Sequence, residues 1–126
     1  ESLKSAAIPE GIEYIDAYAF EHCSSLTDLT LPSGLERIVW HAFSMCASLE
    51  DITVPDGVYC IDDHAFAYCG RLKCVTIPKS VRYIYDGAFA YCDSLTDVYY
   101  GGSESDWKSI DISNYIDLHR HRRIQQ

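Results

Sequence analysis

The sequence predicts a solenoid in which coils of 23 residues stack, with parallel β-strands, short helical or 3₁₀ turns and a small helical cap at the C-terminal end. Three observations predict it. Identical residues recur every 23 positions, the run before Pro32 alternates between apolar and polar side chains, and a helix-capping signal follows the last period. A fixed period of about 20 to 50 residues is typical of solenoids, because stacked units bury an apolar face that one unit cannot bury alone.

Six columns of identical residues define the repeat. They are Pro9, Pro32, Pro55 and Pro78; Ile15, Ile38, Ile61 and Ile84; Ala19, Ala42, Ala65 and Ala88; Phe20, Phe43, Phe66 and Phe89; Cys23, Cys46, Cys69 and Cys92; and Leu26, Leu49, Leu72 and Leu95. Two further columns keep only their apolar character: Leu29, Ile52, Val75 and Val98; and Ile12, Leu35, Val58 and Val81. Paired strands lie about 4.8 Å apart, so each column is expected to form a ladder and the phenylalanine rings to stack.

The segments of one coil follow from its local pattern. Residues 26–31 alternate in polarity, which predicts a strand that ends at Pro32, because proline cannot donate a ladder hydrogen bond. Residues 32–34 predict a turn, and residues 35–39 a second extended segment. Residues 42–46 are too few for a stable helix and predict one helical or 3₁₀ turn.

The chain divides into three parts. Residues 1–100 are expected to form the repeat array, with a partial first repeat and four A-F-x-x-C blocks. Residues 101–118 are expected to form a cap, in which a capping box at 103–106 precedes a short helix and Trp107 and Ile110 lie on the last coil. Residues 119–126 are expected to be a frayed basic tail. The chain begins inside a repeat with no cap, so we expect more coils upstream.

The repeat L-x-x-(L/I/V)-x-(L/I/V)-P-x-x-(L/I/V)-x-x-I-x-x-x-A-F-x-x-C resembles the BspA-like, or Treponema-type, leucine-rich repeats over residues 2–100. The segment YYGGSESDWKSI resembles the usual end of such arrays. Two features depart from the pattern. The chain has only Asn114 and hence no asparagine ladder, and the tail LHRHRRIQQ does not resemble a closing strand. The resemblance implies a leucine-rich-repeat solenoid from a secreted or surface protein of anaerobic bacteria.

Composition narrows the possible partners. The net charge is −9, and the basic residues Arg120, Arg122 and Arg123 gather in the tail, so the acidic body is expected to repel nucleic acid and anionic lipid. No run of apolar residues is long enough to span a bilayer, and no signal peptide opens the chain.

The cysteines of the repeated column are predicted to have a structural role. The ladder cysteines lie along a line and cannot converge on one zinc ion, so they are expected to be buried apolar residues. Disulfides between coils are not expected, because ladder side chains point the same way. Cys60 and Cys74 lie off the ladder, in columns that look outward. They are interpreted as two unpaired, partly exposed thiols, with a disulfide or a reactive pair as alternatives.

Catalysis and metal binding are not expected. The neighbourhood of Cys60 suggests a catalytic thiol with His64 as base and Asp62 or Asp63 as orienting acid. However, the repeat accounts for the positions of these residues, and no oxyanion element or phosphate loop is recognisable. A calcium site at Asp62 and Asp63 would lack the usual loop pattern. We expect no cofactor.

Two surfaces are candidates for binding. The aromatic residues Trp40, Tyr59, Tyr83 and Tyr85 occupy variable positions of the second extended segment, where large rings anchor protein or sugar contacts or cover one another. The acidic column of Asp28, Asp51 and Asp97 on the first strand is the alternative, either as a cation-binding face or as a solvated one.

The sequence favours a non-enzymatic recognition module of a bacterial secreted or cell-surface protein, which binds a host or neighbouring-cell protein or glycan through a rigid face. A solenoid offers a long, shallow surface and no enclosed pocket. The alternative is a structural stalk or spacer without a ligand of its own.

Overall fold

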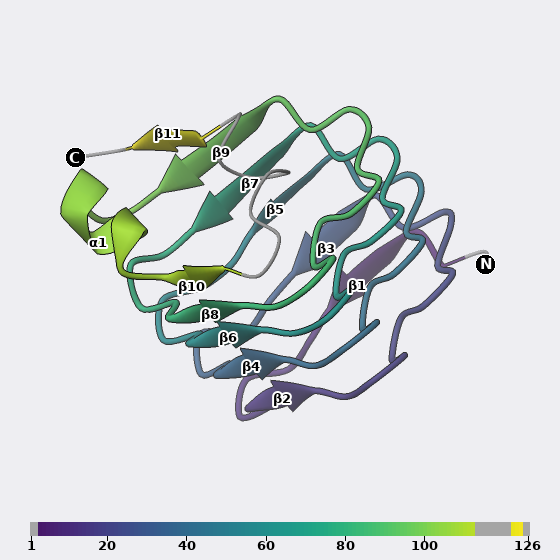
Figure 1. Cartoon of the computed structure of the whole chain (residues 1–126). Coiled ribbons are helices and arrows are strands. Elements are labelled where there is room, and N and C mark those ends of the chain that lie inside the picture. Colours follow the sequence, from purple (N-terminus) through teal and green to yellow (C-terminus); the bar gives the residue numbers. More distant parts are fainter. Residues whose placement is uncertain (1–2, 113–121, 125–126) are drawn as a thin grey trace.

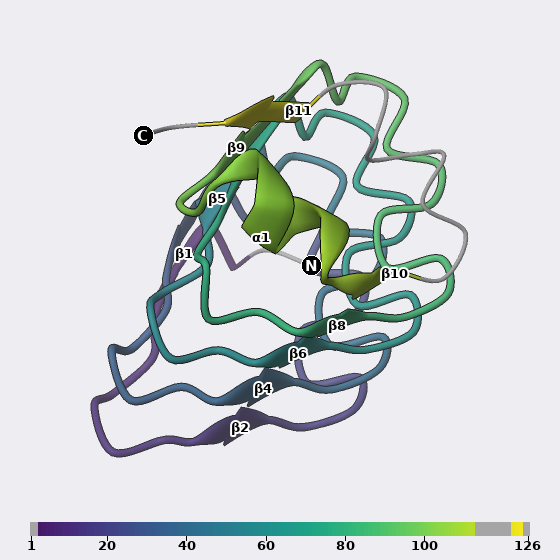
Figure 2. The ribbon, with the colours of Figure 1, turned by 60° about the vertical axis from the view of Figure 1, so that its left-hand side comes forward.

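The computed structural model describes residues 3–112 and 122–124, and in these the chain winds into a solenoid (Figure 1). Each coil contributes one strand to each of two sides, so the odd-numbered strands lie on one side and the even-numbered strands on the other (Figure 2). Every strand pair is parallel and aligns residues of successive coils. The prediction of a parallel-stranded solenoid with 23-residue coils is confirmed.

The strands of the first side are β1 (Ser5–Ala7), β3 (Asp28–Thr30), β5 (Asp51–Thr53), β7 (Cys74–Ile77), β9 (Asp97–Tyr100) and β11 (Arg122–Ile124). The strands of the second side are β2 (Tyr14–Ile15), β4 (Arg37–Ile38), β6 (Cys60–Ile61), β8 (Tyr83–Ile84) and β10 (Asp111–Ile112). The first side divides into a sheet β1–β3 and a sheet β5–β7–β9–β11, whereas the second is one continuous sheet, β2–β4–β6–β8–β10.

The core is built from the repeated apolar columns. Phe20, Phe43, Phe66 and Phe89 stack nearly parallel, with ring centroids 5.2–5.3 Å apart and interplanar angles of 6–9°. The predicted phenylalanine ladder is therefore confirmed. Because each interior ring packs against one ring above and one below, the coils form a single continuous core.

The repeated cysteines satisfy backbone carbonyl groups between coils. Cys46, Cys69 and Cys92 each donate a hydrogen bond from the thiol to the carbonyl oxygen of the phenylalanine 26 residues earlier, at 3.1–3.3 Å. Burial raises the pKa of Cys46 to about 12, and the neighbouring thiol of Cys92 together with burial raises the pKa of Cys69. A small apolar residue with one weak donor suits this position, because the thiol adds a hydrogen bond between coils without placing a strongly polar group in the core.

The segment at 42–46 is not the helical or 3₁₀ turn that the sequence predicts. His41 and Met45 have left-handed backbones, with φ of 59° and 64°. Alternate amides bond within the coil, as Ser44 does to His41, while Phe43 and Met45 donate to carbonyl oxygens of the next coil at 2.8 Å. A longer helix would direct these amides to carbonyl oxygens of its own coil, whereas here half of them bond to the next coil, which explains why linked tight turns replace a helical turn.

The C-terminal end of the solenoid is covered as predicted. Ser103 caps the short helix α1 (Glu104–Lys108) in a reciprocal capping box with Asp106, and Trp107 and Ile110 are buried on the last coil. Within the described residues no helix is long and apolar enough to cross a lipid bilayer.

The expectation of a frayed tail is wrong for Arg122–Ile124. These residues form β11, which pairs with β9 from Arg122 opposite Val98 to Ile124 opposite Tyr100. Without this pairing β9 would present an unpaired strand edge, which explains why a strand forms there. The rest of the segment 119–126 lies outside the described residues.

Candidate functional site

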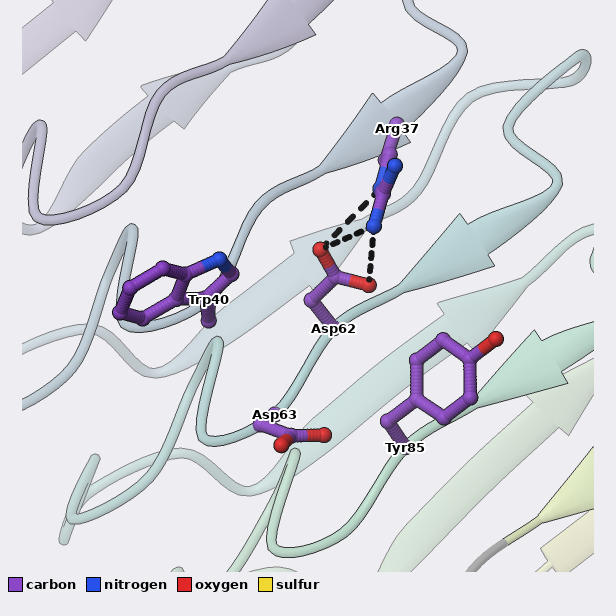
Figure 3. A pocket seen from close by; sticks show the side chains of 5 residues that line it. All are labelled: Arg37, Trp40, Asp62, Asp63 and Tyr85. Atoms are coloured by element: carbon purple, nitrogen blue, oxygen red, sulfur yellow. Dashed lines mark hydrogen bonds and ion pairs between the residues drawn. The ribbon is translucent and has the colours of Figure 1, made fainter.

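A shallow pocket of about 330 Å³ opens on the outer face of the five-stranded sheet (Figure 3). Its lining residues come from three successive coils. They are Arg37 in β4, Trp40 in the following turn, Asp62 and Asp63 after β6, and Tyr85 after β8. Parallel pairing in register brings these residues together, because positions 23 apart in the chain lie side by side.

An ion pair forms one wall of the pocket. The Arg37 guanidinium donates from Nε to Asp62 Oδ2 at 3.1 Å and from a terminal nitrogen to Oδ1 at 3.3 Å. The Asp62 side chain is only 4% exposed, while that of Arg37 is 40% exposed. Two parallel hydrogen bonds fix the guanidinium plane against the carboxylate, so this wall is rigid.

Two of the four predicted aromatic anchors, Trp40 and Tyr85, line this pocket. Tyr83 stacks on Tyr85 with ring centroids 5.9 Å apart and is exposed. Tyr59 is also exposed, directly before β6, but does not line the pocket. The structure thus places Trp40 and Tyr85 at one depression, with Tyr83 stacked on Tyr85, and it does not bring Tyr59 into the lining.

The alternative acidic surface lies on the other side of the solenoid. Asp51 and Asp97 flank Cys74 in the aligned strands β5, β7 and β9. Asp28 belongs to β3, which pairs with β1 and not with β5. Among the described strands the hydrogen-bonded pairing is therefore interrupted between Asp28 and Asp51, and Cys74 separates Asp51 from Asp97.

The expectation that Cys60 is a partly exposed thiol is wrong. Cys60 is 2% exposed, and its thiol donates a hydrogen bond to Asp62 Oδ1 at 3.0 Å. Burial, followed by the hydrogen bond and charge of Asp62, raises its pKa to about 12. Cys74 is partly exposed as expected, and both cysteines are free thiols.

We expect iodoacetamide at pH 8 to alkylate Cys74 well before Cys60 in the native protein. The thiolate is the reacting species, and Cys60 combines burial with a pKa near 12. Peptide mass mapping over time gives the two rates, and unfolded protein, in which they should converge, is the control. Native Cys60 that reacts as fast as Cys74 would contradict the buried Cys60–Asp62 hydrogen bond.

In the segment Asp62–His64, Asp62 accepts the hydrogen bond of the Cys60 thiol, whereas His64 packs against another histidine. The imidazole of His64 stacks on that of His41 with centroids 5.0 Å apart and an interplanar angle of 2°. Gly87 occupies the next place in this column with a φ of 69°, where an added Cβ would lie 2.8 Å from His64 Nε2. In the described part of the chain, no three His, Cys, Asp or Glu side chains are grouped to hold a metal ion.

Sequence reasoning missed the contributions of Arg37 and Asp63 to the pocket. Arg37 pairs diagonally with Asp62, 25 residues away, in one pair of coils only, so no repeated column marks the contact. Asp63 is exposed beside the ion pair. The 23-residue register aligns Arg37 with Cys60, and this alignment could have predicted that Arg37 lies near Asp62.

A family model for the BspA type leucine rich repeat region matches residues 1–116 in six copies. No curated protein sequence matches the chain.

Solved structures that share the fold include the following three. A leucine rich cell surface protein from Faecalibacterium prausnitzii is 30% identical with a TM-score of 0.76, and the match covers 85% of this chain and 34% of that one. The Leucine Rich Repeat protein of T. pallidum is 38% identical with a TM-score of 0.76, and the match covers 78% of this chain and 46% of that one.

The pneumococcal vaccine antigen PcpA, at 22% identity and a TM-score of 0.67, covers 98% of this chain and 36% of its own. The chain thus spans between a third and a half of the length of each of these three structures. With the family model matching nearly all of its length, the chain belongs to the BspA-type leucine-rich repeat family.

Proposed function

We propose that this chain is a non-enzymatic recognition module of a bacterial secreted or cell-surface protein, and that it binds a host or neighbouring-cell protein or glycan. The binding surface would be the outer face of the sheet β2–β4–β6–β8–β10. The observation that carries the proposal is the pocket in which Trp40 and Tyr85 flank a fixed ion pair. The F. prausnitzii relative is a leucine rich cell surface protein, which supports the location.

The aromatic residues suit binding because they are held in place before a ligand arrives. Trp40 is 48% exposed and meets the ring of Tyr18 edge-on at 5.7 Å, while Tyr83 and Tyr85 hold each other by stacking. Rings that lose little freedom on binding contribute more of their contact energy to affinity. The core does not need aromatic residues at these positions. The residue equivalent to Trp40 in the preceding coil is Ala17, and the first coil has Asp16 at the position equivalent to Tyr85.

Immobilised glycan and host-protein arrays, probed with the purified chain, test this function. For a captured ligand, Trp40→Ala and Tyr83→Ala should each weaken binding by about 2 kcal/mol or more, as expected for a hot spot. Tyr91→Ala is the matched control, because Tyr91 is 64% exposed and lies in a turn outside the pocket. Titration calorimetry measures the three affinities.

Two results would argue against the aromatic site. Full affinity in both aromatic variants, with a loss in Asp51→Asn, would move the site to the acidic strands on the other side. Capture of nothing by the wild-type chain across both arrays would favour a structural spacer.

A further inference from the structure

We infer that the pocket receives the guanidinium group of an arginine side chain on a partner protein, with Asp63 as its counter-ion and Trp40 and Tyr85 as its walls. This inference rests on the proposed function and names the partner's chemistry. Asp62 cannot serve the same purpose, because Arg37 and the Cys60 thiol already occupy its oxygens. Asp63 is exposed, and its carboxylate makes no hydrogen bond or ion pair with the described residues.

The charge at the pocket favours a cation. Arg37 and Asp62 neutralise each other, which leaves the negative charge of Asp63. Asp86 follows Asp63 in the same column of the next coil and is also exposed. Arg82, directly before β8, donates to the carbonyl oxygens of Lys79 and Val81, at the end of the strand opposite to Tyr85.

The geometry of the walls suits a flat cation. In Figure 3 the Asp62 carboxylate points at Arg37, whereas Asp63 lies apart from that pair, beside the space between Trp40 and Tyr85. A guanidinium stacks on aromatic faces and donates in its own plane to a carboxylate, so it can use both walls and Asp63 together. A neutral sugar could stack on Trp40 but would gain nothing from the net charge of the site.

The two tryptophans allow a direct test by NMR. Trp40 lines the pocket, and Trp107 in the cap helix α1 is fully buried, so the two indole N–H signals report on the site and on an internal control. The wild-type chain would be titrated with N-acetyl-arginine amide and with its neutral citrulline analogue. We expect a saturable shift of the Trp40 signal with the arginine probe, a smaller response to citrulline, and a constant Trp107 signal.

Asp63→Asn should weaken the arginine probe by about fivefold, the upper range for an exposed ion pair. Asp93→Asn is the matched control, since it removes the same charge from an exposed position outside the pocket and should leave the affinity unchanged. Equal responses to arginine and citrulline, or equal affinities in wild type and Asp63→Asn, would overturn the inference.

The test separates this inference from the function on which it rests. One outcome is that the array screen yields a ligand that requires Trp40 while the Trp40 signal does not shift with the arginine probe. That result would overturn the cationic partner and would still support the recognition function. A shift that saturates with the arginine probe and disappears in Asp63→Asn would support the cationic partner even before a protein ligand is known.

Discussion

Trp107→Ala is expected to lower the free energy of unfolding by about 3–5 kcal/mol, as large-to-small substitutions of buried aromatic residues do. Trp107 is fully buried on the last coil and meets the Tyr100 ring edge-on, with centroids 5.1 Å apart. A solenoid needs its ends covered, so the loss would expose the apolar end of the core as well as leave a cavity. Against a typical stability of about 5–15 kcal/mol this is a large fraction.

Chemical denaturation followed by circular dichroism measures the effect, and the other tryptophan is its control. Trp40 is 48% exposed, so Trp40→Ala should change the stability by about 0.5 kcal/mol or less. Should Trp107→Ala fail to fold, Trp107→Phe keeps an aromatic ring and should give a smaller, measurable loss. Denaturation midpoints that coincide for Trp107→Ala and Trp40→Ala would contradict the capping role of Trp107.

The repeated columns are why the core could be predicted from the sequence. A residue that recurs at every coil, such as those aligned with Phe66 and Cys69, must face the same environment each time, and the structure buries both fully. The capping box at Ser103 was predictable for another reason, since its chemistry is local to four residues.

The parts that the sequence did not predict are those that occur once or that depend on backbone geometry. Cys60 shares a column with the exposed Tyr14 and Tyr83, but its short side chain lies beneath the Arg37–Asp62 pair, which is present in one pair of coils only. A single diagonal contact leaves no periodic signal.

The left-handed turns could not be predicted, because the residue types at these positions do not indicate a positive φ. Tyr18, His41 and His64 all have positive φ. Glycine is the residue that favours this conformation, and in this column only Gly87 is a glycine, so the residue types do not predict the turn. Inter-coil hydrogen bonds from the neighbouring amides impose the turn, and those partners are distant in the sequence.

Phe66→Ala is expected to cost about 3–5 kcal/mol, and more than the same change at Phe20. Phe66 is fully buried and stacks on both Phe43 and Phe89, each at 5.3 Å. Phe20 is partly exposed at the N-terminal end of the stack and meets Phe43 alone, at 5.2 Å. The difference follows because an interior coil of a solenoid has an interface on each side.

Urea denaturation of the two variants and the wild type tests this ladder. Phe66→Leu serves as a control that keeps most of the apolar volume and should cost less than about 1.5 kcal/mol. If Phe66→Ala opens both interfaces of its coil, its unfolding should also become less cooperative and its m-value should fall, whereas Phe20→Ala should keep the wild-type slope. Equal losses at Phe66 and Phe20 would mean that the stacked rings contribute independently of their neighbours, and the core would then not act as one continuous ladder.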